Sequence, residues 1–273
     1  MKVSIRKWFL SVSVLAIGLC LVGTAVLAAT PSGRPPRPGE FNPEHESVEM
    51  FRAIEDGEIE VKLIPRDSTE ANILVENKTE RPLNVELPAA FAGVPVLAQF
   101  GGGGMGGGGF GGGGGTQAIG GGMGGMGGGM GGGMGGGGMG GGFFNVAPEQ
   151  VGRFKVPTVC LEHGKPDPRP AVPYEIRPIQ QYTDRPAVHA LCAMLGTGQL
   201  NQRAAQVAAW MLECDMTWQE LAAKRFRFAN GTSRPYFSPL EIRGGIQIAT
   251  VAVEQAEQEP ERSPGEQQAA RAQ

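Results

Sequence analysis

The 273-residue chain has few of the residues that most often carry chemistry: it contains three histidines, four cysteines and 7% aromatic residues. It has no Walker phosphate-binding loop, no paired-carboxylate site and no zinc-hydrolase motif. The formal net charge is -3, so there is no excess of positive charge to neutralise phosphates, and nucleic-acid binding is not expected. These absences exclude the enzyme classes that such motifs identify, and we expect a non-enzymatic protein without a cofactor.

The N-terminus has the pattern of an export signal. Basic residues, an apolar run from Phe9 to Leu27 and a small-residue cleavage pattern at Val26-Leu27-Ala28 predict a signal peptide over residues 1–29. We therefore expect a periplasmic, cell-surface or extracellular protein that makes no membrane contact after cleavage. An uncleaved anchor is the alternative, because the apolar run is near spanning length.

Removal of the leader leaves three cysteines, Cys160, Cys192 and Cys214. This is an odd number in a compartment that favours disulfides. Cys192 and Cys214 both fall in a predicted helical region and are the favoured pair, which leaves Cys160 over. The spacing alone does not fix this connectivity.

A tract of glycine punctuated by methionine runs from Gly101 to Gly142. Such a composition buries too little surface to offset its ordering entropy, and it predicts a disordered insert. On both sides the sequence is strand-like, with alternation from Ile59 to Leu87 before the tract and from Phe154 to Leu161 after it. We predict one antiparallel β-sandwich interrupted by the insert, since the longer loop adds only about 2 kcal/mol of closure entropy. Two separate units joined by a linker are the alternative.

Helices are predicted at both ends of the sandwich. Asn42 and Pro43 predict a helix to Asp56, and a C-terminal helical region begins near Pro186. Further helix starts are expected at Asn201, at the capping box from Thr217 and at the second capping box from Ser238. Gly244-Gly245 weakens the last helix, for which a strand over 246–253 is the alternative.

The resulting prediction is an α+β fold. Its expected parts are the signal peptide 1–29, linker 30–41, helix and first strands 42–100, disordered insert 101–142, remaining strands and a proline-rich crossover 143–182, helical region 183–256 and disordered tail 257–273.

Cys160 and Gln206 form the first candidate site. Val159-Cys160-Leu161 on a strand and Ala205-Gln206-Val207-Ala208-Ala209-Trp210 on a helix resemble the thioester domains of bacterial surface adhesins. In that family a strand cysteine condenses with a glutamine to give an internal thioester that traps amines. The resemblance implies that Cys160 supplies the sulfur, Gln206 the acyl carbon and His163 a nearby base, although Ala205 replaces the family's threonine. The alternative is that Cys160 is a buried strand residue and Gln206 a polar residue on a packed helix.

The second candidate is a metal site. Thioethers are soft ligands that select Cu(I), and five lie close together in the tract: Met123, Met126, Met130, Met134 and Met139. The alternative is that methionine only punctuates the glycine repeat. Zinc is less favoured, because Cys160-x2-His163 has no second short ligand pair.

The third candidate is a segment in which cations and aromatic residues alternate. It runs from Lys224 to Phe228 and continues with Arg234, Tyr236 and Phe237. Such interleaving is typical of binders of single strands or sugars. The alternative is that the aromatics pack inward and the cations complement the end of a helix.

As a whole, the run from Phe51 through Leu97, the Gly/Met-rich tract and the segment from Val159 to Pro168 resemble a set of exported planctomycete proteins with no assigned activity. That resemblance implies secretion and brings no catalytic residues. We predict an envelope or extracellular protein in attachment or matrix interaction, with a surface, matrix or protein partner. Thioester-mediated attachment and Cu(I) binding are the alternatives.

Overall fold

The structure is a computed structural model that describes residues 39, 41–96, 115–125 and 142–258. The predicted signal peptide and most of the predicted tail lie outside these residues. Among the described helices, none is long and apolar enough to cross a membrane. The fold is mixed α+β, as predicted.

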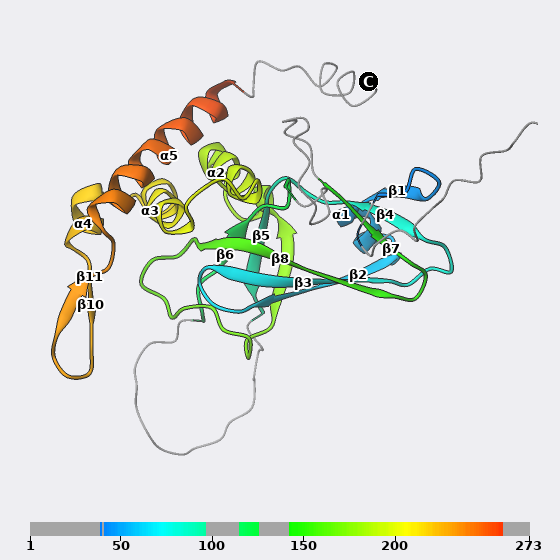
Figure 1. The fold of residues 1–273 in the computed structure, drawn as a ribbon, viewed down its shortest axis with the longest axis horizontal. Coiled ribbons are helices and arrows are strands. Elements are labelled where there is room, and N and C mark those ends of the chain that lie inside the picture. Colours follow the sequence, from blue (N-terminus) through cyan, green and yellow to red (C-terminus); the bar gives the residue numbers. More distant parts are fainter. Residues whose placement is uncertain (1–38, 40, 97–114, 126–141, 259–273) are drawn as a thin grey trace, which may run out of the picture. The chain divides into compact units, whose positions relative to one another are not determined.

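The elements follow one another along the chain as Figure 1 labels them. Their bounds are β1 (Glu46–Glu49), α1 (Met50–Glu55), β2 (Ile59–Pro65), β3 (Glu70–Asn77), β4 (Leu83–Glu86), β5 (Phe91–Pro95), β6 (Ile119–Gly121), β7 (Phe143–Val146), β8 (Val151–Cys160), β9 (Tyr174–Pro178), the 3₁₀ turn η1 (Ile179–Gln181), α2 (Pro186–Gly196), α3 (Gln202–Glu213), α4 (Trp218–Ala223), β10 (Arg225–Arg227), β11 (Ser233–Pro235) and α5 (Pro239–Gln258).

Six antiparallel strands form a closed barrel in the order β2-β3-β8-β6-β5-β9. The barrel closes because β9 pairs with β5 along its length and also meets β2, where Leu63 lies opposite Tyr174. A separate three-stranded sheet has the order β1-β4-β7. The predicted sandwich is therefore wrong in its architecture, because a strand within the tract and a strand after the proline-rich run close the sheet on itself.

Strands from the two sides of the glycine tract pair directly. β3 and β8 form an antiparallel ladder from Glu70 opposite Pro157 to Glu76 opposite Val151, and the two strands lie side by side in Figure 1. Ile73 and Val75 on β3 belong to the same buried cluster as Phe154 on β8. This confirms that the flanks of the tract share one sheet and one core, and two units joined by a linker are excluded.

Part of the tract is a strand of that barrel. β6 lies between β5 and β8, and Ile119 and Met123 are fully buried in the core. The predicted insert of residues 101–142 is thus wrong for residues 115–125. Residues 101–114 and 126–141 lie outside the described part of the chain.

The glycines around β6 are required by close backbone contacts with helix α2. A Cβ atom on Gly122 would lie 2.2 Å from the Cys192 carbonyl oxygen, and one on Gly196 of α2 would lie 2.5 Å from the Gly122 carbonyl carbon. A Cβ on Gly121 would lie 2.8 Å from the Phe91 ring. Glycine in a strand often marks such an approach, and here it allows α2 to pack directly on the barrel.

The predicted first helix over residues 42–56 is only partly formed. Residues Glu46–Glu49 are strand β1, which pairs in parallel with β4, and helix α1 begins at Met50. The N-cap is Glu49, whose carboxylate accepts from the Phe51 and Arg52 amides. Asn42 instead receives a hydrogen bond at its carbonyl from the Asn84 side chain at 2.7 Å. The pairing of β1 with β4 therefore outweighs the helix start that Asn42 and Pro43 predict.

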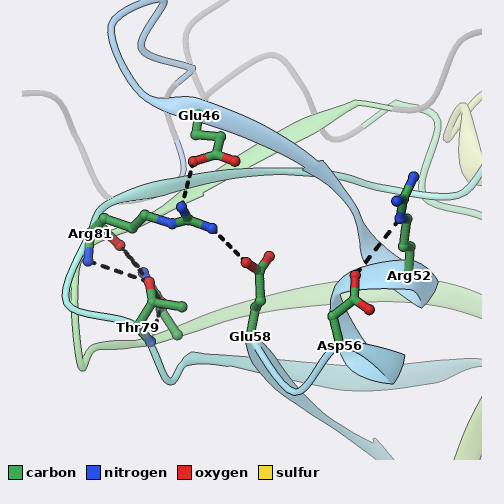
Figure 2. A network of polar contacts seen from close by, with 7 residues as sticks. Glu46, Arg52, Asp56, Glu58, Thr79 and Arg81 are labelled. Atoms are coloured by element: carbon green, nitrogen blue, oxygen red, sulfur yellow. Dashed lines mark hydrogen bonds and ion pairs between the residues drawn. The ribbon is translucent and has the colours of Figure 1, made fainter.

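Ion pairs join the surface of this region, as Figure 2 shows. The Arg81 guanidinium lies between Glu46 of β1, at 2.9 Å, and Glu58, the residue before β2, while Arg52 pairs with Asp56 beside them. The side chains are substantially exposed, so each pair contributes about 0–1 kcal/mol. They tie neighbouring segments together without determining the fold.

The predicted starts of the C-terminal helices are confirmed. Asn201 accepts from the Ala204 amide at 3.0 Å, and Thr217 and Glu220 form a reciprocal capping box at the start of α4. Ser238 and Glu241 repeat that box, because each accepts a hydrogen bond from the other's backbone amide. The segment after Ser238 is helix α5, so the alternative strand over 246–253 is excluded.

Of the two adjacent glycines in α5, Gly245 is the one that the packing against α3 requires. A Cβ atom there would lie 2.4 Å from Cβ of Val207 on α3, whereas one on Gly244 would lie 3.2 Å from the Ala204 methyl group. We expect Gly245→Ala to lower the free energy of unfolding by about 1–3 kcal/mol through overpacking. Gly244→Ala should stay within about 1 kcal/mol of wild type, since the gain in helix propensity offsets a mild contact. Urea denaturation measures both, and equal effects would contradict this packing.

A second prediction concerns the strand within the tract. Ile119→Ala should lower the free energy of unfolding by about 2–5 kcal/mol, because it opens a cavity in the barrel core. Val96→Ala is the control, since that side chain is 47% exposed and should change stability by less than about 0.5 kcal/mol. Matching urea midpoints for the two variants would show that Ile119 belongs to an insert outside the core.

Candidate functional site

Cys160 and Gln206, which the sequence paired as a candidate site, are in direct contact. The Cys160 amide donates to Oε1 of Gln206 at 2.8 Å, and Nε2 of Gln206 donates to the Cys160 carbonyl at 2.9 Å. Both residues are buried. The contact therefore runs through the backbone of Cys160 and occupies both ends of the Gln206 amide.

This contact completes the edge of strand β8. The ladder with β3 ends at Pro157, beyond which the Thr158 amide donates to the Thr69 carbonyl at 2.9 Å. The Thr158 carbonyl accepts from Nε2 of Gln202 at 2.8 Å, one helical turn before Gln206. Two glutamine amides on α3 thus take the place of a neighbouring strand, because buried backbone groups need partners.

The side chain of Cys160 lies on the opposite face of β8 from those of Val159 and Leu161. Ile119 is its partner across the ladder and packs in the same cluster, whereas Val159 and Leu161 pack in the cluster formed with α2 and α3. Burial raises the pKa of the Cys160 thiol far above its ordinary value. The thiol therefore stays protonated and is a weak nucleophile at neutral pH. Condensation with Gln206 would also require both amide hydrogen bonds to break.

The predicted disulfide between Cys192 and Cys214 is not formed, and all three cysteines are free thiols. Sγ of Cys192 points from α2 toward Gly120 of β6, where burial raises the thiol pKa to about 12. Cys214 caps the end of α3, and its thiol donates to the Leu161 carbonyl at 3.2 Å. The two sulfurs are thus engaged with different parts of the barrel wall.

His163 does not act on Cys160. Its ring meets Trp210 edge-on, with centroids 4.8 Å apart, and its Nε2 lies 2.8 Å from Nζ of Lys224. Partial burial, with the positive charge of Lys224 second, lowers the pKa of His163. The neutral imidazole therefore accepts from Lys224 and belongs to the packing around Trp210.

Of the candidate copper ligands, the structure describes only Met123. Its thioether is buried in the barrel core and is not presented to solvent. Met126, Met130, Met134 and Met139 lie outside the described residues. Within the described residues, no three His, Cys, Asp or Glu side chains gather as a metal cluster would require.

The cation–aromatic segment forms an exposed hairpin between α4 and α5. β10 and β11 pair with Phe226 opposite Arg234, so these two side chains share one face. The Arg234 guanidinium lies 5.7 Å from the Phe226 ring centre and 5.9 Å from that of Phe228. The two rings meet edge to face, 5.0 Å apart. Phe226 and Phe228 therefore point outward, whereas Phe237 is buried. The alternative that the aromatics pack inward is right for Phe237 and wrong for Phe226 and Phe228.

We call this region the hairpin surface. It consists of side chains that are exposed and lie on the hairpin or on α4 beside it: Trp218, Arg225, Phe226, Arg227, Phe228 and Arg234. Among the described residues, no carboxylate lies within ion-pair distance of these three arginines. The surface therefore presents apolar rings together with positive charge that is not neutralised.

A mainly apolar groove of about 470 Å³ adjoins the hairpin surface. Trp218 forms one wall, and the other walls come from the hairpin end and the first turns of α5. Trp218 is 48% exposed and lies at the first position of α4. In the sequence Trp218 is recognisable only as part of a capping box, which predicts a helix start and no binding role. Its exposure comes from the structure alone.

The base of the hairpin is fixed to the helices by a stack of cations and rings. Lys224 lies 5.3 Å from the Trp210 ring centre and 5.1 Å from that of Tyr236. On α3, Arg203 lies 5.1 Å from the Tyr236 ring centre and pairs with Glu241 at 2.9 Å. These contacts hold the hairpin in a defined position before any partner arrives.

Comparisons of this chain with protein-family models, with curated proteins and with solved structures give no match. The resemblances to thioester domains and to exported planctomycete proteins therefore stay predictions.

The role of Gln206 can be tested by substitution. Gln206→Ala leaves the amide and carbonyl of Cys160 buried without partners, and we expect a loss of about 2–5 kcal/mol in the free energy of unfolding. Gln247→Ala, at an exposed position of α5, is the helix-matched control and should change stability little. Thermal or urea unfolding gives both values, and equal values would contradict the role of Gln206.

Intact mass under non-reducing conditions tests the thioester. We expect the mature chain without any loss of ammonia, and three thiols that react with a maleimide only after unfolding or slowly. A mass lower by one ammonia that methylamine restores would establish the bond between Cys160 and Gln206 and overturn the hydrogen-bonding role described above.

Proposed function

We propose that this chain is an exported, non-enzymatic protein of the cell envelope or extracellular space that attaches to a surface or matrix partner. The observation that supports this proposal is the hairpin surface. Three large aromatic side chains, Trp218, Phe226 and Phe228, are between 42% and 48% exposed. The arginines beside them form no ion pair with any carboxylate in the part of the chain that the structure describes. Covering each of them with a partner contributes about 1–3 kcal/mol, which is a physical reason to expect binding there.

The described cysteines do not favour the thioester alternative. Burial raises the pKa of all three thiols, so none of them is a thiolate at neutral pH. Trp and Arg are the residues that most often dominate the energy of interfaces, and both are present on the hairpin surface. In the proposed attachment function, the exposed side chains of the hairpin surface contact the partner.

Cu(I) binding remains a separate prediction from the sequence, because four of its five methionines lie outside the described residues. A Cu(I) titration of the mature chain beside a variant in which those four are replaced by leucine tests it. Undiminished binding by the variant would exclude Met126, Met130, Met134 and Met139 as ligands.

The attachment proposal predicts that the mature protein cosediments with envelope and matrix material of the source cells. The double variant Phe226→Ala/Phe228→Ala should bind at least about tenfold more weakly, because two exposed rings are removed. Phe41→Ala is the matched control, since Phe41 is 44% exposed, as Phe226 is, and should leave binding unchanged. Equal retention of the double variant and wild type would overturn the proposed surface, provided that thermal unfolding shows both folded.

A further inference from the structure

We propose that the ligand of the hairpin surface is a carboxylate-bearing polysaccharide. Its sugar rings lie against Phe226 and Phe228, and its carboxylates meet the arginines. This inference rests on the proposed attachment function and names the chemistry of the partner.

The strand register places different chemistry on the two faces. Phe226, Phe228 and Arg234 share one face, where the guanidinium lies over both rings. Arg225 and Arg227 alternate with the aromatics and therefore lie on the other face. A guanidinium fixed beside an apolar ring suits a saccharide that carries an acid, because the ring covers C–H groups while the fork of N–H donors binds the carboxylate bidentately.

The charges around the hairpin favour an anionic partner. Arg243 on α5 lines the adjoining groove and adds a cation next to the surface. Two carboxylates on the helices that flank the hairpin are already engaged: Glu241 pairs with Arg203, and Glu220 accepts from the Thr217 backbone in the capping box of α4. The local charge is therefore positive although the whole chain has a net charge of -3.

The tip of the hairpin argues against insertion into a bilayer. It is polar: the Thr232 hydroxyl donates to Oδ1 of Asn230 at 2.7 Å, and the Gly231 amide donates to the Phe228 carbonyl at 3.0 Å. A membrane-inserting loop carries apolar residues at its tip, whereas here they lie on a lateral face. That face suits a polymer chain lying across the hairpin.

The ring geometry also favours a sugar over a nucleobase. Single-strand binders stack successive bases on flat aromatic faces. Phe226 and Phe228 meet at an interplanar angle of 68°, so they do not form two parallel platforms. A pyranose ring offers C–H groups to such a tilted pair and does not require parallel faces.

The experiment uses the full mature chain and measures binding to polygalacturonate by isothermal titration calorimetry or affinity electrophoresis. We expect binding that weakens as salt is raised, since charge pairing contributes. Arg234→Gln and Phe226→Ala/Phe228→Ala should each weaken it at least about tenfold. Arg52→Gln and Phe41→Ala, which alter exposed residues of the same types away from the hairpin, should stay within about twofold of wild type.

Four other probes test the ligand class and separate it from the attachment function. A neutral dextran should not bind, and a single-stranded DNA oligonucleotide and phosphatidylglycerol vesicles should bind more weakly than polygalacturonate. Equal or tighter binding to any of these three would overturn the carboxylate-bearing polysaccharide as the ligand. The fourth probe is the matrix material itself: if it binds through the hairpin but polygalacturonate does not, the ligand class is wrong and the attachment function stands. If the matrix material does not bind either, the attachment function is wrong, and the ligand proposal that rests on it is wrong as well.

Discussion

The contact between helix α2 and the backbone directly after β6 leaves no space for a side chain on either partner, and the arrangement of the helices depends on it. Gly122 and Gly196 meet so closely that a Cβ atom on either would overlap the other's main chain. This contact fixes α2 on the barrel wall. α2 and α3 then share one buried cluster with Val159 and Leu161 of β8. Gly122 belongs to a tract that looks like low-complexity sequence, but it is a specific packing residue.

The glutamines of α3 form hydrogen bonds with the backbone of β8 that a neighbouring strand would normally form. Gln206 satisfies both backbone groups of Cys160, and Gln202 satisfies the Thr158 carbonyl, at the edge that β3 leaves open. A side chain that closes a strand edge has its donor and acceptor committed. The same contact therefore explains why Cys160 and Gln206 are neighbours and why reactivity is not needed to account for their pairing.

Much of the fold could be predicted from local signals, and the errors have physical causes. Alternation identified β2 and β3, and capping residues such as Asn201, Thr217 and Ser238 identified helix starts, because these features act within a few residues. β6 has almost no side chains to alternate, so its burial depends on partners distant in sequence. Without β6 the barrel was not recognisable. The proposed disulfide failed for a related reason, since a shared helical region says nothing about the direction in which each thiol points.

The candidate binding site, too, could be predicted only in part from the sequence. Its residue types were visible in the sequence, but whether Phe226 and Phe228 pack inward is decided by how the hairpin is held. Trp210 is the residue on which this depends, because Lys224 and Tyr236 stack against it and fix the base of the hairpin. The aromatic rings beyond that base remain exposed beside Arg234. A surface fixed in advance loses less conformational entropy on binding, so more of the energy of its exposed rings and arginines is available to hold a partner.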